Sequence, residues 1–190
     1  KRKLTSLGIS NFMIFHPSAQ YEYKIYPEKL RNELLSLLSK SDIPIIVTGG
    51  DNLIDREIKK SLLHENKIFD WIGSTSIDEF IALSQLSSGY IGMDTLNMHI
   101  AASQNKRIFA IFGPTNLSMW SPWDNELSLS AKTNLPLQTY GNITIFQADM
   151  ECVACGQKGC QNSGYSKCLD NINPNLILDN VVDWYENGQH

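Results

Sequence analysis

The sequence predicts an α/β protein whose core is a Rossmann-like, doubly wound parallel sheet. Between residue 9 and about residue 112, short apolar segments alternate with longer segments in which apolar residues recur at helical spacing. The short segments are hydrophobic throughout, which is typical of strands buried on both faces of a parallel sheet. A chain of 190 residues, 42% hydrophobic and 19% charged, has the size and composition of one globular domain.

The expected elements alternate between strand and helix. Pro27 suits the first turn of a helix, the β-branched segment after Pro44 suits a strand, and Ser76 with Glu79 forms a capping box. We therefore expect strands at residues 9–15, 44–48, 68–72, 90–93 and 107–112, with helices at residues 27–38, 53–63, 76–86 and about 95–104.

The pattern becomes less regular after residue 112. Two weak strands, at residues 127–129 and 143–146, precede a segment that contains all the cysteines, and a helix at about 174–186 ends the chain. These changes in pattern divide the chain into three parts. They are a Rossmann-like domain at residues 1–150, a Cys-rich C-terminal loop at 151–170 and a terminal helical segment that closes the domain at 171–190.

Composition excludes several classes of protein. The chain has 16 basic and 20 acidic residues, and the net charge of −4 argues against a nucleic-acid-binding protein with a basic stripe. No apolar run is long enough to span a membrane. The chain starts at Lys1 without Met or a signal peptide, and its cysteines lie in one window. We therefore expect a piece of a longer protein from a reducing, cytoplasmic compartment.

The turns after the strands are the expected binding site. Ligands of an open parallel sheet lie beyond the carboxyl ends of the strands, where helix N-termini attract anions. The first turn offers Ser18 and Lys24 to a phosphate, and the second, with Gly50 and Asp51, allows a ligand to approach the backbone closely. A solvated lysine and a simple tight turn are the alternative interpretations.

The turn after the fourth strand is the most informative. Asp94 follows the strand, Thr95 is placed to cap the next helix, and His99 lies one helical turn further along the same face. This arrangement suits a sugar hydroxyl at Asp94 beside a phosphate at Thr95 and His99. The alternative is an ordinary N-cap with a half-buried histidine. Thr115, in the turn after the fifth strand, is either a site residue or part of a structural turn.

These turns, taken in order, form a family pattern. The chain resembles the lipopolysaccharide heptosyltransferases, the ADP-heptose-type enzymes of glycosyltransferase family nine, through Asp94-Thr95-x-x-x-His99-x-Ala101-Ala102 and Phe112-Gly113-Pro114-Thr115. Supporting matches are the cysteine segment, Lys24, Tyr26-Pro27 and the turns His16-Pro17-Ser18 and Thr48-Gly49-Gly50. The resemblance covers nearly the whole chain but only the C-terminal half of the family's proteins.

The resemblance implies one half of a GT-B enzyme, in which the C-terminal Rossmann-like domain binds the nucleotide-sugar donor. It places Lys24 and Thr95 at the diphosphate and Asp94 at the transferred sugar. His99 then lies near the phosphates, and Ser18 lines the phosphate turn. The other expected donor-site residues are Leu96, where the family commonly has Gly, and Gly50, Asp51 and Thr115.

The resemblance also implies a reaction. Heptose would pass from ADP-heptose to a lipid-anchored saccharide of the lipopolysaccharide core or a related surface glycan, by inversion that needs no metal or other cofactor. The general base belongs to the N-terminal domain, so we expect no catalytic residue in this chain, no turnover by the chain alone and at most peripheral contact with the inner membrane. The alternatives are another GT-B transferase or a sugar-nucleotide epimerase with a different donor, and a non-catalytic, metal-stabilised docking module.

The cysteine segment allows several chemical states. Its thiols, at Cys152, Cys155, Cys160 and Cys168, are close enough in sequence to hold structural zinc, because closed all-cysteine sites are structural rather than catalytic. Iron is also compatible with this spacing. Two disulfides formed on oxidation, or four reduced cysteines that pack a loop, are the alternatives.

Overall fold

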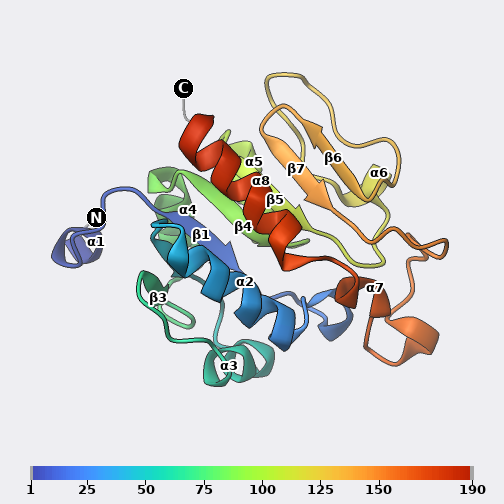
Figure 1. Cartoon of the computed structure of the whole chain (residues 1–190), viewed down its shortest axis with the longest axis horizontal. Helices are drawn as coiled ribbons and strands as arrows, with labels where there is room; N and C mark the ends of the chain where they lie inside the picture. Colours follow the sequence, from blue (N-terminus) through green and yellow to red (C-terminus); the bar gives the residue numbers. More distant parts are fainter. Residues whose placement is uncertain (1, 189–190) are drawn as a thin grey trace.

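The computed structural model describes residues 2–188 and confirms the Rossmann-like α/β class (Figure 1). Its sheet has the strand order β3-β2-β1-β4-β5-β7-β6, and the pairs are parallel except for β6 with β7. The strands are β1 (Met13–His16), β2 (Ile45–Val47), β3 (Ile68–Asp70), β4 (Gly89–Met93), β5 (Arg107–Ile111), β6 (Leu137–Tyr140) and β7 (Ile143–Phe146).

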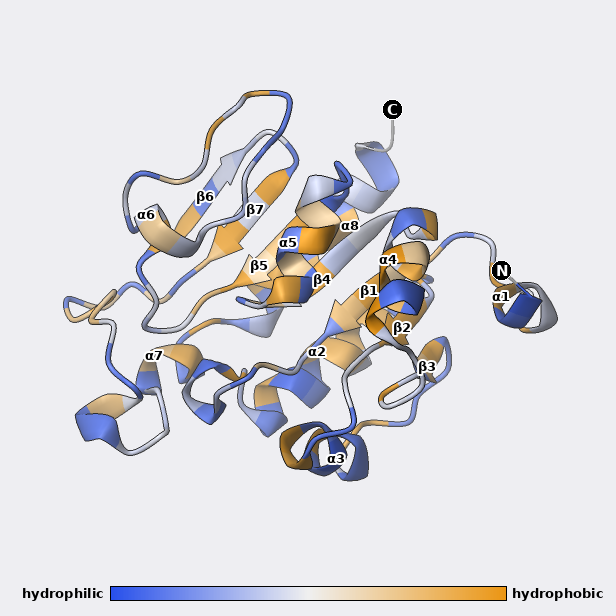
Figure 2. Cartoon of the chain, turned by 180° about the vertical axis from the view of Figure 1, so that it is seen from behind, coloured by the Kyte–Doolittle hydropathy of each residue, from blue (hydrophilic) through white to orange (hydrophobic). Residues whose placement is uncertain are grey.

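Helices cover both faces of the sheet, as Figures 1 and 2 show from opposite sides. One face carries α2 (Glu28–Lys40), α3 (Leu53–Lys60) and α8 (Pro174–Asn187), and the other carries α4 (Ile77–Leu86) and α5 (Leu96–Ser103). The shorter helices are α1 (Arg2–Ser6), α6 (Leu117–Trp120), α7 (Lys167–Asp170) and the 3₁₀ turns η1 (Glu22–Lys24) and η2 (Cys160–Asn162).

The core has two halves, one on each side of the sheet. Successive side chains of a strand point to opposite faces, so Met13 and Phe15 pack on the side of α2 and α8 while Ile14 packs on the side of α4 and α5. All three side chains are fully buried. This two-sided burial explains why the strands are hydrophobic throughout.

The structure corrects three local expectations. The first strand begins at Met13 rather than at residue 9. The expected strand at residues 127–129 is only an isolated bridge between Asp124 and Leu129, and β6 was not expected. The side chains of β6 are exposed or half-buried because this strand lies at the edge of the sheet, where it needs no apolar run.

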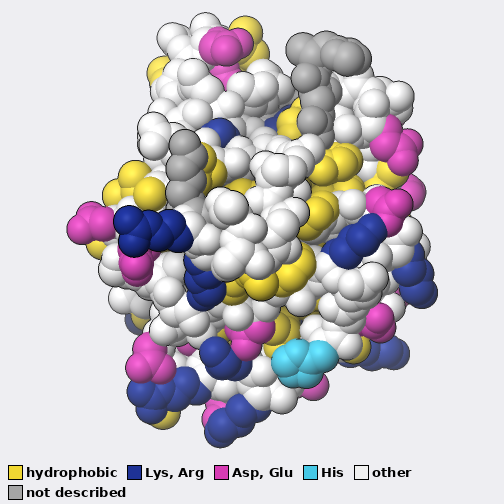
Figure 3. All heavy atoms as spheres, turned by 90° about the vertical axis from the view of Figure 1, so that its left-hand side faces the viewer, with side chains coloured by type: hydrophobic (Ala, Val, Ile, Leu, Met, Phe, Trp, Pro, Cys, Tyr) yellow, Lys and Arg dark blue, Asp and Glu magenta, His cyan; other side chains and the backbone are white. Residues whose placement is uncertain are grey.

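The surface shows no strong segregation of charge on the face drawn in Figure 3. There, Lys and Arg side chains lie interspersed with Asp and Glu side chains. Among the described helices, none combines the length and the apolar character that crossing a membrane requires.

A buried hydrogen bond joins the segment just before α2 to the segment just before α8. The Tyr26 hydroxyl, just before α2, donates to the Ile172 carbonyl oxygen at 2.5 Å, just before α8. Tyr26 is fully buried, and burial raises the pKa of its phenol above the usual value. This bond fixes how α8 begins against α2.

We expect Tyr26→Phe to lower the free energy of unfolding by about 1–2 kcal/mol, because the Ile172 carbonyl loses its buried donor. Denaturant unfolding followed by circular dichroism measures this change. Tyr165→Phe is the matched control, since the Tyr165 hydroxyl also donates a hydrogen bond, to the Asp170 side chain, but Tyr165 is exposed. Equal effects of the two variants would show that the buried bond has no special structural role.

Candidate functional site

A cavity of about 1000 Å³ lies at the carboxyl ends of the strands. The turns after β1, β2, β4 and β5 line it, together with the start of α4 and two residues of the cysteine segment, Gly156 and Gln157. The strand order reverses between β1 and β4, which makes this the switch point where open α/β sheets bind their ligands.

The predicted turn residues converge on this cavity, with one exception. The structure brings together at its lining Ser18, Lys24, Gly50, Asp94, Thr95, Leu96, His99 and Thr115. Asp51 does not line the cavity, although its neighbours on both sides do. Turns that are far apart in sequence therefore form one site.

The centre of the cavity wall is an ion pair between Lys24 and Asp94. Lys24 Nζ lies 2.6 Å from Asp94 Oδ2, and the two side chains are only 17% and 5% exposed. Lys24 ends η1 after β1, whereas Asp94 directly follows β4. The pair thus joins the two turns at the switch point, where solvent screens charges less than it does on the surface.

The N-terminus of α5 lies beside this pair without a side-chain cap. Thr95 occupies the N-cap position, but its hydroxyl makes no capping hydrogen bond and lies 3.4 Å from the Tyr90 hydroxyl. The expectation that Thr95 caps the helix through its side chain is therefore wrong. The first N–H groups of α5 are left without a side-chain acceptor, which suits an anionic ligand.

His99 lies half-buried one turn into α5. Burial lowers its pKa below the usual value, the nearby Asp94 carboxylate opposes this shift and Lys24 reinforces it. The imidazole is therefore neutral at neutral pH, with one N–H to donate and one nitrogen to accept.

Sequence reasoning missed a second polar group in the cavity, formed by His16, Thr48 and Asp55. His16 Nδ1 lies 3.0 Å from Thr48 Oγ1, and burial lowers the pKa of His16 to about 4, although Asp55 opposes the shift. Asp55 is 2% exposed, and within the described part of the chain its Oδ1 has no hydrogen-bond partner. The available signal was Asn52, whose side chain caps α3 at the Asp55 N–H and so places Asp55 in the first helical turn.

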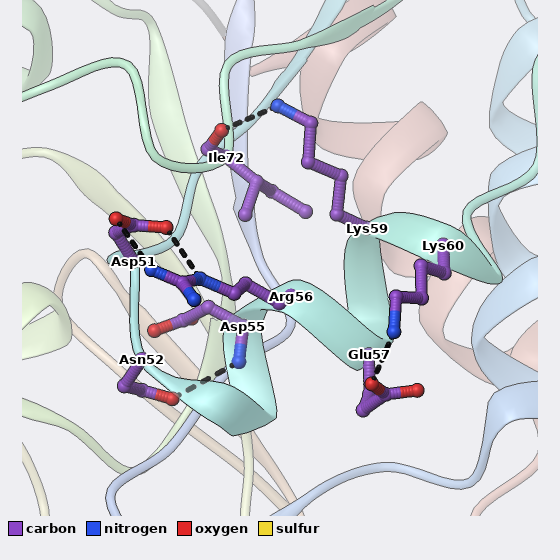
Figure 4. Close-up of polar contacts among 8 residues, drawn as sticks. All are labelled: Asp51, Asn52, Asp55, Arg56, Glu57, Lys59, Lys60 and Ile72. Carbon is purple, nitrogen blue, oxygen red and sulfur yellow. Dashed lines mark hydrogen bonds and ion pairs between the residues drawn. The ribbon is translucent and has the colours of Figure 1, made fainter.

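Asp51 lies next to Asn52 in the turn between β2 and α3, near Arg56 (Figure 4). Its carboxylate accepts two hydrogen bonds from Arg56, at 2.9 and 3.0 Å, and these bonds hold the pKa of Asp51 below its usual value. Its side chain is 70% exposed. Asp51 is therefore engaged at the surface rather than at the cavity.

The cysteine segment does not form a metal site in this structure. All four cysteines are free, with Cys152 and Cys155 exposed, Cys160 half-buried and Cys168 buried. Across residues 2–188, no three His, Cys, Asp or Glu side chains are grouped to hold a metal ion, so the arrangement does not fit the zinc or iron that the cysteine spacing allows. The segment instead supplies part of the cavity wall, where the Gly156 N–H donates to the Pro114 carbonyl at 2.8 Å.

Fold and cavity together define a Rossmann-like α/β protein whose switch point holds a site lined by an ion pair and several hydroxyl groups. The chain belongs to glycosyltransferase family 9 (heptosyltransferase), whose family model matches residues 1–164. This confirms the family assignment made from the turn motifs.

Named relatives agree with this assignment. The chain is 25% identical over 156 residues to lipooligosaccharide heptosyltransferase 2 of Campylobacter jejuni, covering 81% of this chain and 44% of that protein. It also matches the solved E. coli ADP-heptose lipopolysaccharide heptosyltransferase II, with a TM-score of 0.64 and 21% identity over 97% of this chain and 51% of the other.

A third match is E. coli heptosyltransferase WaaC, solved with ADP. Its TM-score is 0.65 and its identity 15%, over 90% of this chain and 43% of the other. Likeness at this level of identity establishes the shared fold. The chain spans about half the length of the relatives it matches.

We expect the four thiols to react at different rates with an alkylating reagent. Cys152 and Cys155 should react fastest because they are exposed, and Cys168 should react only on unfolding because burial raises its pKa to about 11. Timed alkylation followed by peptide mass spectrometry measures each rate. Protection of all four thiols in the native protein, with release of zinc or iron on unfolding, would contradict the free-thiol arrangement.

We also expect acid to destabilise the protein through His16. An unfolded histidine binds its proton near pH 6.5, whereas native His16 does so near pH 4, so unfolding takes up a proton between these values. Stability should therefore fall as the pH drops from 6.5 towards 4. Denaturant unfolding at pH 7 and pH 5 should show a smaller loss for His16→Gln than for the wild type.

His64 supplies the control for this measurement, because it is exposed. His64→Gln makes the same substitution at that exposed position and is measured at the same two pH values. His99 contributes a loss of the same sign, so His16→Gln removes only part of the wild-type effect. Identical pH dependence in His16→Gln and wild type would mean that native His16 takes up its proton as readily as the unfolded chain.

Proposed function

We propose that this chain is the donor-binding part of a glycosyltransferase and that it binds ADP-heptose. The observation that carries the proposal is the Lys24–Asp94 ion pair beside the uncapped N-terminus of α5, inside a cavity of about 1000 Å³. A cation and free N–H groups suit a diphosphate, and a carboxylate suits sugar hydroxyls. The relatives are heptosyltransferases, and one related structure contains ADP.

Each residue has a defined role in this proposal. Lys24 Nζ and the first N–H groups of α5 hold the diphosphate, with the Thr95 hydroxyl beside them. Neutral His99 donates a hydrogen bond near the phosphates, and Ser18 lines the phosphate turn. Asp94 accepts hydrogen bonds from the transferred sugar. The remaining predicted residues in the cavity lining, Gly50, Leu96 and Thr115, shape its wall.

This arrangement also stabilises a leaving group. When the bond between the sugar carbon and the β-phosphate oxygen breaks, the nucleoside diphosphate gains negative charge at that oxygen. Lys24 and the α5 N-terminus are already in place to stabilise this charge, which is where positioned donors contribute most to rate. The roles assigned above leave no residue to act as general base towards the acceptor, so we assign the base to a part of the enzyme outside this chain and propose that the chain alone does not turn over.

The acceptor and cellular setting follow from the same proposal. The relatives are named for lipooligosaccharide and lipopolysaccharide, so we propose a lipid-anchored saccharide as the acceptor. An enzyme that draws on a nucleotide sugar and a lipid-anchored acceptor would act in the cytoplasm, at the surface of the inner membrane.

Calorimetric titration of the chain with ADP, UDP and GDP tests the proposal. We expect ADP to bind most tightly, and we expect Lys24→Gln to weaken ADP binding by about tenfold or more, because it removes a charge-assisted contact to phosphate. Lys40→Gln makes the same change in charge on an exposed residue at the C-terminal end of α2, which does not line the cavity, and should have no effect.

A preference for UDP or GDP would contradict the ADP-linked donor while leaving a nucleotide site in place. Failure of all three nucleotides to bind a folded sample would contradict the donor site itself. Equal losses from Lys24→Gln and Lys40→Gln would show that only net charge, and not the cavity, attracts the nucleotide.

A further inference from the structure

Trp120, the last residue of α6, is exposed at the cavity although it is a large aromatic residue. It lines the cavity and is 50% exposed, and its neighbour Met119 lines the cavity and is 71% exposed. Exposed apolar side chains within a concave site are typical of ligand contacts. The sequence motifs and the ion pair assign no role to this surface.

The Trp120 ring lies next to the central ion pair. Lys24 Nζ is 5.6 Å from the ring centroid, within the range of a cation–π contact. Lys24 is in turn 2.6 Å from Asp94. The ring face therefore lies beside the charged groups that, under the proposed function, hold the diphosphate and the sugar.

We propose that Trp120 is a stacking platform for the transferred sugar and so helps to determine which sugar is accepted. This inference rests on the proposed function. A sugar ring has an apolar face of C–H groups whose hydrogens carry a small positive charge, and the face of an aromatic ring is negative. Trp120 would contact this apolar face while Asp94 binds the hydroxyl groups at the ring edge.

The strand order favours the sugar over the base as the partner of Trp120. From the ion pair at β1 and β4, the cavity extends in two directions, towards β2 and β3 on one side and towards β5 on the other. Trp120 follows β5, whereas Gly49 and Gly50 follow β2. A diphosphate held at Lys24 has one group at each end, so a nucleoside on the glycine side leaves the sugar at Trp120.

Three variants test this assignment. Trp120→Ala removes the ring, Trp120→Phe keeps an aromatic face, and Trp123→Ala removes a tryptophan that is equally exposed, at 49%, but is not among the residues lining the cavity. Each variant and the wild type are titrated with ADP and with ADP-heptose. ADP also has an additional ionisable oxygen on its terminal phosphate, so the change in the ratio of the two dissociation constants from wild type to variant, rather than the ratio itself, isolates the contact of Trp120 with the sugar.

We expect Trp120→Ala to weaken ADP-heptose binding by about tenfold and ADP binding by less than about twofold, because only the sugar loses its platform. Trp120→Phe should recover most of the loss, and Trp123→Ala should match the wild type. Tryptophan fluorescence gives a second signal. ADP-heptose should change the emission of the wild type and of Trp123→Ala more than that of Trp120→Phe.

Other results would overturn the inference. Equal losses for ADP and ADP-heptose in Trp120→Ala would show that the ring acts through Lys24, and unchanged affinities would show that it does not touch the sugar. A wild type that binds neither ligand would instead contradict the proposed function, and the inference with it.

Discussion

The close approach of β1 and β4 is the constraint on which the rest of the site depends. His16 at the end of β1 pairs in register with Gly92 of β4. A Cβ atom on Gly92 would collide with the His16 carbonyl oxygen and lie 2.9 Å from the Tyr90 hydroxyl, so only glycine allows this contact without movement of the backbone. The contact aligns the ends of the two strands, and the turns that follow bring Lys24 and Asp94 together across 70 residues of sequence.

The other walls of the cavity are fixed by contacts from later parts of the chain. Gln147, which follows β7 and is 4% exposed, donates to the carbonyl oxygens of Gly113 and Thr115 at 3.0 and 2.9 Å. The turn after β5 is therefore held from the neighbouring strand, and the cysteine segment adds a backbone bond to Pro114. These contacts give the cysteine segment a structural role that does not require a metal, since Cys168 packs in the core beside Leu169.

The sequence predicts well what depends on local pattern and poorly what depends on neighbours in space. Buried central strands such as β2 and β5 have apolar runs that identify them, and Ser76 with Glu79 forms the expected capping box. The edge strand β6 has no such run, because only one of its sides is paired. The position of Lys24 and Asp94 after their strands predicts the cavity. Their pairing, like the burial of Asp55, depends on which turns meet, and this information is not present in a single segment.

The ion pair favours binding of a complete nucleotide sugar over binding of the free nucleoside diphosphate. Lys24 and Asp94 compensate each other at 2.6 Å while they are largely shielded from water. A diphosphate that draws Lys24 towards itself weakens this compensation, and a buried carboxylate with less compensation is costly. Under the proposed function, a nucleotide sugar gives both residues of the pair a new partner, because its phosphates engage Lys24 while its hydroxyls donate to Asp94. The free nucleoside diphosphate gives a new partner to Lys24 but none to Asp94, so the same two residues favour binding of the donor over retention of the product.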